Sequence, residues 1–194
     1  IMIAGDIYDK AVPSAEAVSL FDDFVTSLKE AVPHSTIMMI SGNHDSAPRI
    51  DCFRQVLLKQ NLYMVGNPPE KEEDHIERIT LNDNYGPVHF YLLPFVKPSM
   101  VKNIIGTNDG RNYSYNETLK KLIEREEINT EDRNVLISHQ FYLPVNKKAE
   151  EIERADSEIR TAGNIDEVSG EVLLPFDYAA LGHIHKPMKV GSDI

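Results

Sequence analysis

Residues 36–45 read TIMMISGNHD, an apolar run that ends in a cluster of polar side chains. The five residues up to Ile40 are apolar or β-branched, which is typical of a buried strand. Asn43, His44 and Asp45 follow at the point where that strand would end. Open α/β sheets bind ligands at the carboxyl ends of their strands. This stretch therefore predicts an α/β fold with a functional site at one edge of its sheet.

Three further apolar runs end in the same way. Residues 1–4 (IMIA) lead into Gly5 and Asp6, residues 135–137 (VLI) into Ser138 and His139, and residues 178–181 (YAAL) into Gly182, His183, Ile184 and His185. Asp, Asn and His are ligands of divalent metals. One such residue after a strand is more often structural, because buried polar groups are usually just hydrogen-bonded. Four clusters in one chain predict a metal-dependent hydrolase.

Composition limits the other classes. The chain has 194 residues, 41% of them apolar, which suits one domain with a full core. Its 20 Lys and Arg against 31 Asp and Glu give a net charge of -11, which argues against binding nucleic acid by bulk positive charge but leaves local contacts open. Arg49 and Lys186 lie near the clusters and are candidates to contact a substrate phosphate. No apolar run approaches the roughly 20 residues of a membrane span.

Periodicity predicts the remaining elements. An amphipathic helix is expected from Ser14, its N-cap, to Leu28, and a second helix after Pro48 should bury the single cysteine, Cys52, on its apolar face. Residues 79–93 favour a hairpin in a second sheet, and residues 116–127 favour another helix. Residues 144–170 are expected to form a long loop beside the site. The other histidines, His34, His75 and His89, follow no strand and are expected in a loop or on the hairpin surface.

The clusters suit a two-metal site. Side chains alternate along extended backbone, so His183 and His185 should face the same side and reach different ions. Asp6 is the natural bridge between two ions, and Asn43 and His139 would complete the shell of one of them.

His44 is the expected general acid. It adjoins Asn43 and should face the opposite way, toward the leaving group, where an imidazole can protonate a departing alkoxide. Asp45 or another carboxylate, for which Asp9 is a candidate, would hold its ring. The attacking group would be a water activated by the metal ions, so no protein nucleophile is needed.

The motifs GDIYD (residues 5–9), GNHD (42–45), SH (138–139) and GHIH (182–185) resemble the ordered motifs of the calcineurin-like metallophosphoesterases along the whole chain. Finer stretches are similar to the SbcD nuclease-subunit family, namely AGDIYD (4–9), SAPR (46–49), YLLPF (91–95) and FDYAALGHIHKP (176–187). The resemblance implies a four-layer α/β/β/α sandwich of the metallophosphoesterase type over residues 1–194.

The resemblance also implies an activity. It implies a dimanganese site that cleaves DNA, as an exonuclease on duplex ends and an endonuclease on single strands and hairpins. Asp6 would bridge the ions, Asn43, His139 and His183 would hold one, His185 would hold the other, and His44 would be the acid. The implied partners are DNA, an SbcC-like SMC-type ATPase and a second copy of the nuclease chain, in a cytoplasmic complex that serves DNA repair, recombination and replication.

The family has parts that this sequence lacks. Its first motif is an Asp-x-His that supplies two ligands to the ion held by His185, and its closing strands and DNA-capping domain follow the last motif. We therefore expect a partial domain, incomplete at both ends. A polypeptide that began at Ile1 would hold that ion by Asp6 and His185 alone, and we expect such a chain to bind one ion at most.

Two alternatives remain open. The same metals and His44 would serve a phosphodiesterase or phosphatase acting on small nucleotides or phosphoproteins. A catalytically silent scaffold is disfavoured because Asn43, His44, His183 and His185 occur together.

Overall fold

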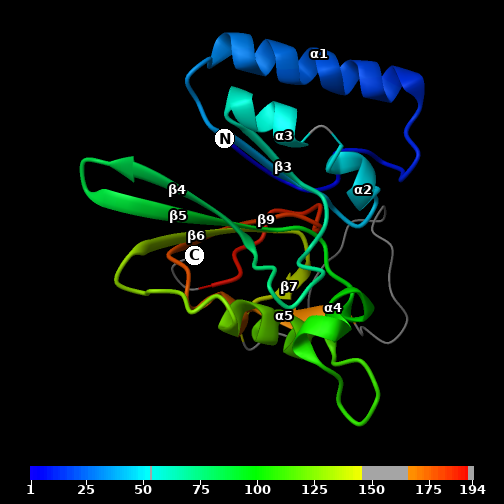
Figure 1. Ribbon diagram of the computed structural model, residues 1–194, viewed down its shortest axis with the longest axis vertical. Coiled ribbons are helices and arrows are strands. Elements are labelled where there is room, and N and C mark those ends of the chain that lie inside the picture. Colours follow the sequence, from blue (N-terminus) through cyan, green and yellow to red (C-terminus); the bar gives the residue numbers. More distant parts are fainter. Residues whose placement is uncertain (53, 146–165, 192–194) are drawn as a thin grey trace.

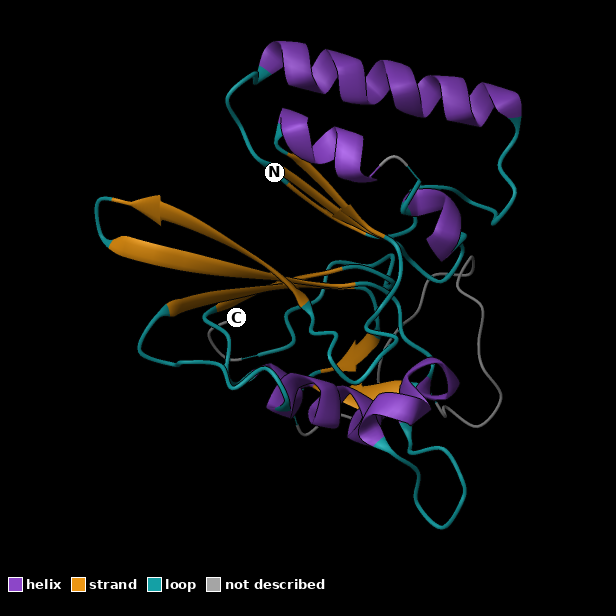
Figure 2. Ribbon diagram, in the orientation of Figure 1, coloured by secondary structure: helices purple, strands orange, loops and turns teal. Residues whose placement is uncertain are grey.

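Two β-sheets lie face to face between two layers of helices (Figures 1 and 2). The structure is a computed structural model that describes residues 1–52, 54–145 and 166–191. In Figure 1, α1 and α3 cover one sheet, and α4 and α5 cover the other. The expected four-layer α/β/β/α architecture is confirmed.

The first sheet is parallel. Its order is β1 (Met2–Ala4), β2 (Ile37–Ile40) and β3 (Leu62–Val65), with Ala4 opposite Ile40 and Ile40 opposite Val65. All four residues of β2, the central strand, are buried. The expected strand before the Asn43 cluster is therefore confirmed, and parallel pairing brings the carboxyl ends of all three strands to one edge.

Helix α1 (Ala15–Ala31) connects β1 to β2 and covers the outer face of this sheet. The hydroxyl of Ser14 accepts a hydrogen bond from the amide of Ala17, as expected of an N-cap. Phe21, Val25 and Leu28 pack on the sheet. Leu20 is 71% exposed and Phe24 is 47% exposed, so the buried stripe is narrower than the sequence suggested.

The helix expected after Pro48 is divided. The structure has α2 (Ala47–Ile50), α3 (Arg54–Leu57) and a 3₁₀ turn, Leu58–Gln60. Between α2 and α3 the chain turns at Asp51, whose carboxylate accepts hydrogen bonds from the amides of Gly66 and Asn67. Cys52 lies in that turn and is exposed, so its predicted burial was wrong. The spacing of apolar residues predicts burial only while the helix continues, and here a contact with Gly66 and Asn67 ends the helix before Cys52.

The second sheet contains the expected hairpin. Its order is β4 (Glu77–Asp83), β5 (Gly86–Leu93), β6 (Arg133–Ser138) and β9 (Tyr178–Leu181). The pair β4 and β5 is antiparallel, and the other pairs are parallel. Apolar side chains of both sheets fill the space between them, among them Met38, Ile40, Leu92 and Ile137.

The fourth layer covers the other face of this sheet. It contains α4 (Pro98–Ile105), α5 (Tyr115–Glu124), the strand pair β7 (Phe141–Leu143) and β8 (Glu167–Ser169), and a 3₁₀ turn, Gly170–Leu173. Helix α5 matches the expected helix, whereas α4 was not expected. The loop predicted for residues 144–170 lies mostly outside the described residues, and its last part forms β8. Among the helices of the described residues, none has the length and apolarity needed to cross a membrane.

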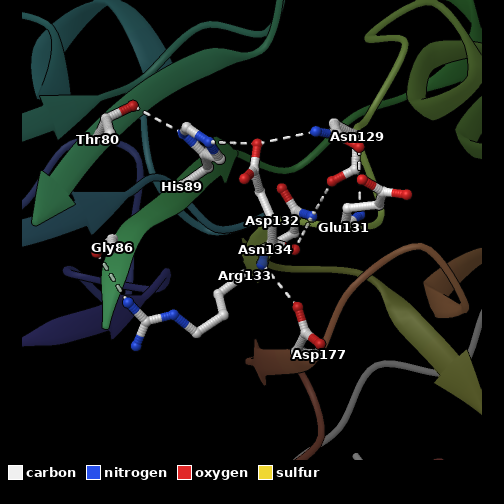
Figure 3. Close-up of polar contacts among 9 residues, drawn as sticks. All are labelled: Thr80, Gly86, His89, Asn129, Glu131, Asp132, Arg133, Asn134 and Asp177. Carbon is white, nitrogen blue, oxygen red and sulfur yellow. Dashed lines mark hydrogen bonds and ion pairs between the residues drawn. The ribbon is translucent and has the colours of Figure 1, made fainter. Parts of the chain in front are cut away.

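A polar network joins β4, β5 and the start of β6 (Figure 3). Nδ1 of His89 lies 2.8 Å from the hydroxyl of Thr80, and Nε2 lies 3.4 Å from a carboxylate oxygen of Asp132. His89 lies on the hairpin as expected, but its side chain is only 16% exposed, so it is partly covered. The guanidinium of Arg133 donates to both oxygens of Asp83 and to the carbonyl of Gly86.

This network gives a pH-dependent stability. The hydrogen bond from Arg133, together with the amide of Tyr85, lowers the pKa of Asp83 to about 2. A depressed carboxyl pKa stabilises the fold above the unfolded value and loses that effect as pH falls. We expect the difference in unfolding free energy between wild type and Asp83→Asn to be constant above about pH 4 and to shrink toward pH 2. Urea unfolding across this range measures it, and a difference that does not vary with pH would contradict the assignment.

Candidate metal centre

Four strands end at the same place. Strand β1 packs against β6 and β9 across the space between the sheets. The amide of Phe95, just past β5, donates to the carbonyl of Ser41, just past β2. Asp6, Asn43, His139 and His183 each follow one of these strands, so both sheets contribute side chains to one site.

His139 is the centre of this group and is 1% exposed. Its Nδ1 lies 2.6 Å from the carbonyl oxygen of Ala4. A carbonyl can only accept, so Nδ1 carries the proton. Nε2 faces an oxygen of Asp6 at 3.2 Å and the amide oxygen of Asn43 at 3.1 Å. A histidine whose other nitrogen donates to a carbonyl is held as metal-binding histidines are.

His183 completes the group. Its Nδ1 lies 2.9 Å from the amide oxygen of Asn43. Its φ is 84°, and that of Asp6 is 49°, so both residues have left-handed backbone. Non-glycine residues in this region are uncommon and cluster at functional sites. Because β9 ends at Leu181, the extended backbone expected through His183 and His185 is not present. His185 is exposed and lines a neighbouring cavity.

The donor atoms suit a divalent cation. Nε2 of His139 lies 3.2 Å from Asp6 and 3.1 Å from Asn43, and Nδ1 of His183 lies 2.9 Å from Asn43. Ligands at right angles on bonds of about 2.1 Å would be about 3 Å apart. Within the described residues, His, Cys, Asp and Glu alone form no group of three or more that could hold a metal ion. The amide oxygen of Asn43 contacts both His139 and His183. A group that includes Asn43 as well as Asp6 and the two histidines therefore fits a metal ion.

Asp6 is held in its charged form. Burial raises its pKa, but the amide of His44 and the hydrogen bond and charge of His139, in the form of the ring that carries a proton on Nε2 as well as on Nδ1, lower it, and the balance lies below the usual value. One oxygen faces His139, and the other accepts from the amide of His44 at 3.1 Å. An ionised carboxylate fixed through both oxygens is available as a ligand without reorganisation.

Aromatic rings surround the two histidines. The ring of Phe95 stacks on His183, with centroids 6.4 Å apart, and meets His139 edge-on. Phe141, which is 2% exposed, contacts His183 from β7. Sequence analysis assigned no role to either phenylalanine. Phe95 follows a strand end, as the other site residues do, and that position is the signal that could have identified it.

His44 lies beside this group. Its Nδ1 is 3.1 Å from the backbone carbonyl of Asp9, so Nε2 is the nitrogen left for proton transfer, which it can make when both ring nitrogens carry a proton. The ring is thus held by a carbonyl rather than by the carboxylate of Asp45 or Asp9. This differs from the expectation because every residue has a backbone carbonyl, so the sequence does not indicate which one contacts His44.

Asp45 has a different position from the one expected. One oxygen accepts from the amides of Ile7 and Gly42, at 3.0 and 2.8 Å, and the other accepts from Tyr8 at 2.8 Å. Burial raises the pKa of Asp45, the three amides oppose that effect, and the charge of Asp6 adds to it, so the pKa lies above its usual value. Through these hydrogen bonds Asp45 connects the loop that contains Asp6 with the loop that contains Asn43.

Gly182 permits a close approach of the two sheets. A Cβ at this position would overlap the carbonyl oxygen of Ala4 and Nδ1 of His139. A Cβ at Gly42 would likewise overlap the carboxylate of Asp6. Both glycines are therefore required by the packing around the site.

The two expected phosphate contacts come from different elements. Arg49 is exposed on α2, which directly follows the loop of Asn43 and His44. Lys186 is exposed and lines the same cavity as His185.

The calcineurin-like phosphoesterase family model matches residues 1–187, and the chain belongs to that family. The SbcD subunit of the SbcCD nuclease of Staphylococcus epidermidis is 31% identical over 197 residues, an alignment that covers 99% of this chain and 47% of that protein. The chain thus spans about half the length of this curated relative.

Replacing Asp45 by Asn should loosen both loops. An amide has one acceptor oxygen, and its NH₂ would face backbone donors, so we expect a loss of about 1–3 kcal/mol of unfolding free energy and weaker Mn²⁺ binding. Urea unfolding and isothermal titration measure the two effects. Asp23→Asn, on the exposed side of α1, is the matched control. Unchanged stability and metal affinity in Asp45→Asn would contradict the role assigned to Asp45.

Gly182→Ala should displace His139 from Ala4. We expect Mn²⁺ affinity to fall by an order of magnitude or more, since the partners that orient a metal ligand commonly contribute 10–100-fold. Gly110→Ala controls for stability alone, because its φ is 77° and no atom lies within 4 Å of the added Cβ. It should cost about 1 kcal/mol without changing metal affinity. Equal metal affinities in the two variants would refute the steric argument.

Proposed function

We propose that the protein is a DNA nuclease that hydrolyses phosphodiester bonds with two divalent ions, which we take to be Mn²⁺. The observation that carries this proposal is the convergence of Asp6, Asn43, His139 and His183, with His44 beside them, at the junction of the two sheets. The name of the 31% identical relative supports a nuclease over other phosphoesterases.

The residues divide the work. Asn43, His139 and His183 would hold one ion, His185 would hold the other, and Asp6 would bridge them. Bound divalent ions polarise phosphoryl oxygens and make water a nucleophile near neutral pH. The ionised Asp6 and the hydrogen bond from Nδ1 that orients the ring of His139 prepare the ligand set before substrate arrives. Phe95 and Phe141 limit the access of bulk water to the two imidazoles.

His44 would protonate the leaving oxygen from Nε2, because Nδ1 is occupied by the carbonyl of Asp9. Arg49 and Lys186 would bind phosphates on either side of the scissile bond. Local contacts of this kind suit a chain whose net charge of -11 does not favour binding DNA by overall attraction.

The proposal extends to the assembly. Residues 1–194 would be part of the nuclease domain of a longer chain that pairs with an SbcC-like SMC-type ATPase, forms a homodimer and acts in the cytoplasm in DNA repair, recombination and replication. Its reactions would be exonuclease cleavage at duplex ends and endonuclease cleavage of single strands and hairpins. The support for these partners is the relative named as a subunit of the SbcCD nuclease.

An assay of the full-length protein with Mn²⁺ tests the function. Hairpin DNA, linear duplex DNA and an aryl phosphodiester are compared under the same conditions. We expect cleavage of both DNA substrates. Hydrolysis of the aryl ester without cleavage of DNA would overturn the nuclease proposal in favour of a small-molecule phosphodiesterase. Absence of any hydrolysis would favour the catalytically silent scaffold.

His44→Ala should abolish turnover and preserve Mn²⁺ binding, because the imidazole supplies a proton rather than a ligand. Loss of a general acid is expected to cost about 10²–10⁴-fold in rate. His34→Ala is the matched control, since His34 is exposed in the loop between α1 and β2. Turnover measured beside isothermal titration separates the two roles. Normal turnover in His44→Ala would remove His44 from the reaction.

A further inference from the structure

The side chain of Gln140 connects two segments that meet at His183. Gln140 follows His139, just past β6, and is 1% exposed. Its NH₂ donates to the carbonyl oxygen of Val96 at 3.2 Å, and Val96 lies just past β5 and is 0% exposed. A carbonyl oxygen can only accept, so this contact determines which end of the amide faces Val96. Gln140 thus extends the connection between β5 and β6 past their last paired residues.

The two connected segments supply three rings that contact His183. Phe95, in the segment after β5, stacks on His183 with centroids 6.4 Å apart and an angle of 19° between the rings. His139 and Phe141, on either side of Gln140, meet the same imidazole at centroid distances of 5.3 and 6.3 Å. The hydrogen bond from Gln140 therefore sets the position of the first ring relative to the other two.

Phe95 has a second contact that holds its backbone. Its amide donates to the carbonyl of Ser41 at 3.0 Å, and the hydroxyl of Ser41 donates to the carbonyl of Gly66 at 2.6 Å. Ser41 thus holds the segment on the side of the first sheet, and Gln140 holds it on the side of β6. With both contacts in place, the backbone on each side of the Phe95 ring is fixed, which limits the orientations open to that ring.

The burial of Gln140 costs free energy. Its Oε1 is buried and has no hydrogen-bond partner among the described residues. Most buried polar groups are paired, and an unpaired one destabilises the fold. An apolar side chain of similar size would avoid this cost but could not donate to Val96. The donated hydrogen bond is therefore what distinguishes Gln140 from an apolar residue at this position.

We propose that Gln140 is a positioning residue for His183. It acts through the carbonyl of Val96 and the ring of Phe95, which help to hold the imidazole with Nδ1 2.9 Å from the amide oxygen of Asn43. Residues that orient a metal ligand without touching the metal commonly contribute 10–100-fold to metal affinity. The inference rests on the proposed function, since it takes His183 as a metal ligand.

The test compares Gln140→Met with Asn134→Leu in the full-length protein. The first variant keeps an unbranched side chain of similar length and removes the donor. Asn134 is the matched control because it is also a buried amide, 0% exposed, whose NH₂ donates to backbone carbonyls and whose oxygen has no partner among the described residues. It lies near the start of β6, at the opposite end from Gln140. A loss of stability alone should therefore affect both variants alike.

Two measurements follow the position of His183. Selective ¹³C labelling of histidine gives its Cε1–H signal in the metal-free protein, and the chemical shift of that signal depends on the neighbouring aromatic rings. We expect Gln140→Met to move the signal and to weaken Mn²⁺ binding, measured by isothermal titration, about ten-fold. Asn134→Leu should change neither. An unchanged signal and affinity in Gln140→Met, or equal changes in the two variants, would overturn the proposal.

Phe95→Leu tests the same route without a change at Gln140. It removes the stacked ring, and we expect it to move the His183 signal in the same direction and to weaken Mn²⁺ binding by a similar factor. Adding Gln140→Met to it should cause little further loss. Independent losses, or an unchanged signal and affinity in Phe95→Leu, would refute the route through Phe95.

The two measurements also separate this inference from the proposed function. A wild-type protein that binds no Mn²⁺ would refute the metal-dependent nuclease, while the signal of the metal-free protein would still test Gln140. Normal Mn²⁺ binding and DNA cleavage in Gln140→Met, with an unchanged His183 signal, would refute the role of Gln140 alone.

Discussion

The hydrogen bond between His139 and the carbonyl of Ala4 joins the two sheets at the candidate metal centre. It keeps a proton on Nδ1 of His139 and orients the ring so that Nε2 faces Asp6 and Asn43. The bond forms only because Gly182 leaves room for it. The ligand set therefore depends on the packing of the whole sandwich and not on any one loop.

The surrounding contacts serve the same arrangement. Asp45 gathers three amides from the two loops of the first sheet, while Phe95 connects β5 to β2 and covers His183. Burial of Asp45 is tolerated because each of its three contacts with backbone amides is a charge-assisted hydrogen bond. Hydrogen bonds to backbone amides and contacts with aromatic rings thus hold the candidate ligands in place.

The sequence was sufficient for the fold class, the hairpin and the convergence of Asp6, Asn43, His139 and His183, since apolar runs and strand-end positions are local patterns. It was not sufficient where a distant contact decides the conformation. Asp51 turns the chain before Cys52 because of an amide beyond β3, and His89 is shielded by Asp132, forty-three positions away. The position of Asp45 depends on hydrogen bonds from backbone amides, and a sequence pattern does not show which amides a carboxylate will contact. The position of His185 depends on the left-handed backbone at His183, which the alternation of side chains along a strand does not predict.

The division of the ligands between two sheets has a thermodynamic consequence. Asp6 and Asn43 belong to one sheet, and His139 and His183 belong to the other, with an apolar layer between them. An ion bound by all four is lost when the sheets separate, so its concentration acts on the folding equilibrium by mass action. Such an ion would link the two sheets across the hydrophobic core, and the protein would be less stable where that ion is scarce.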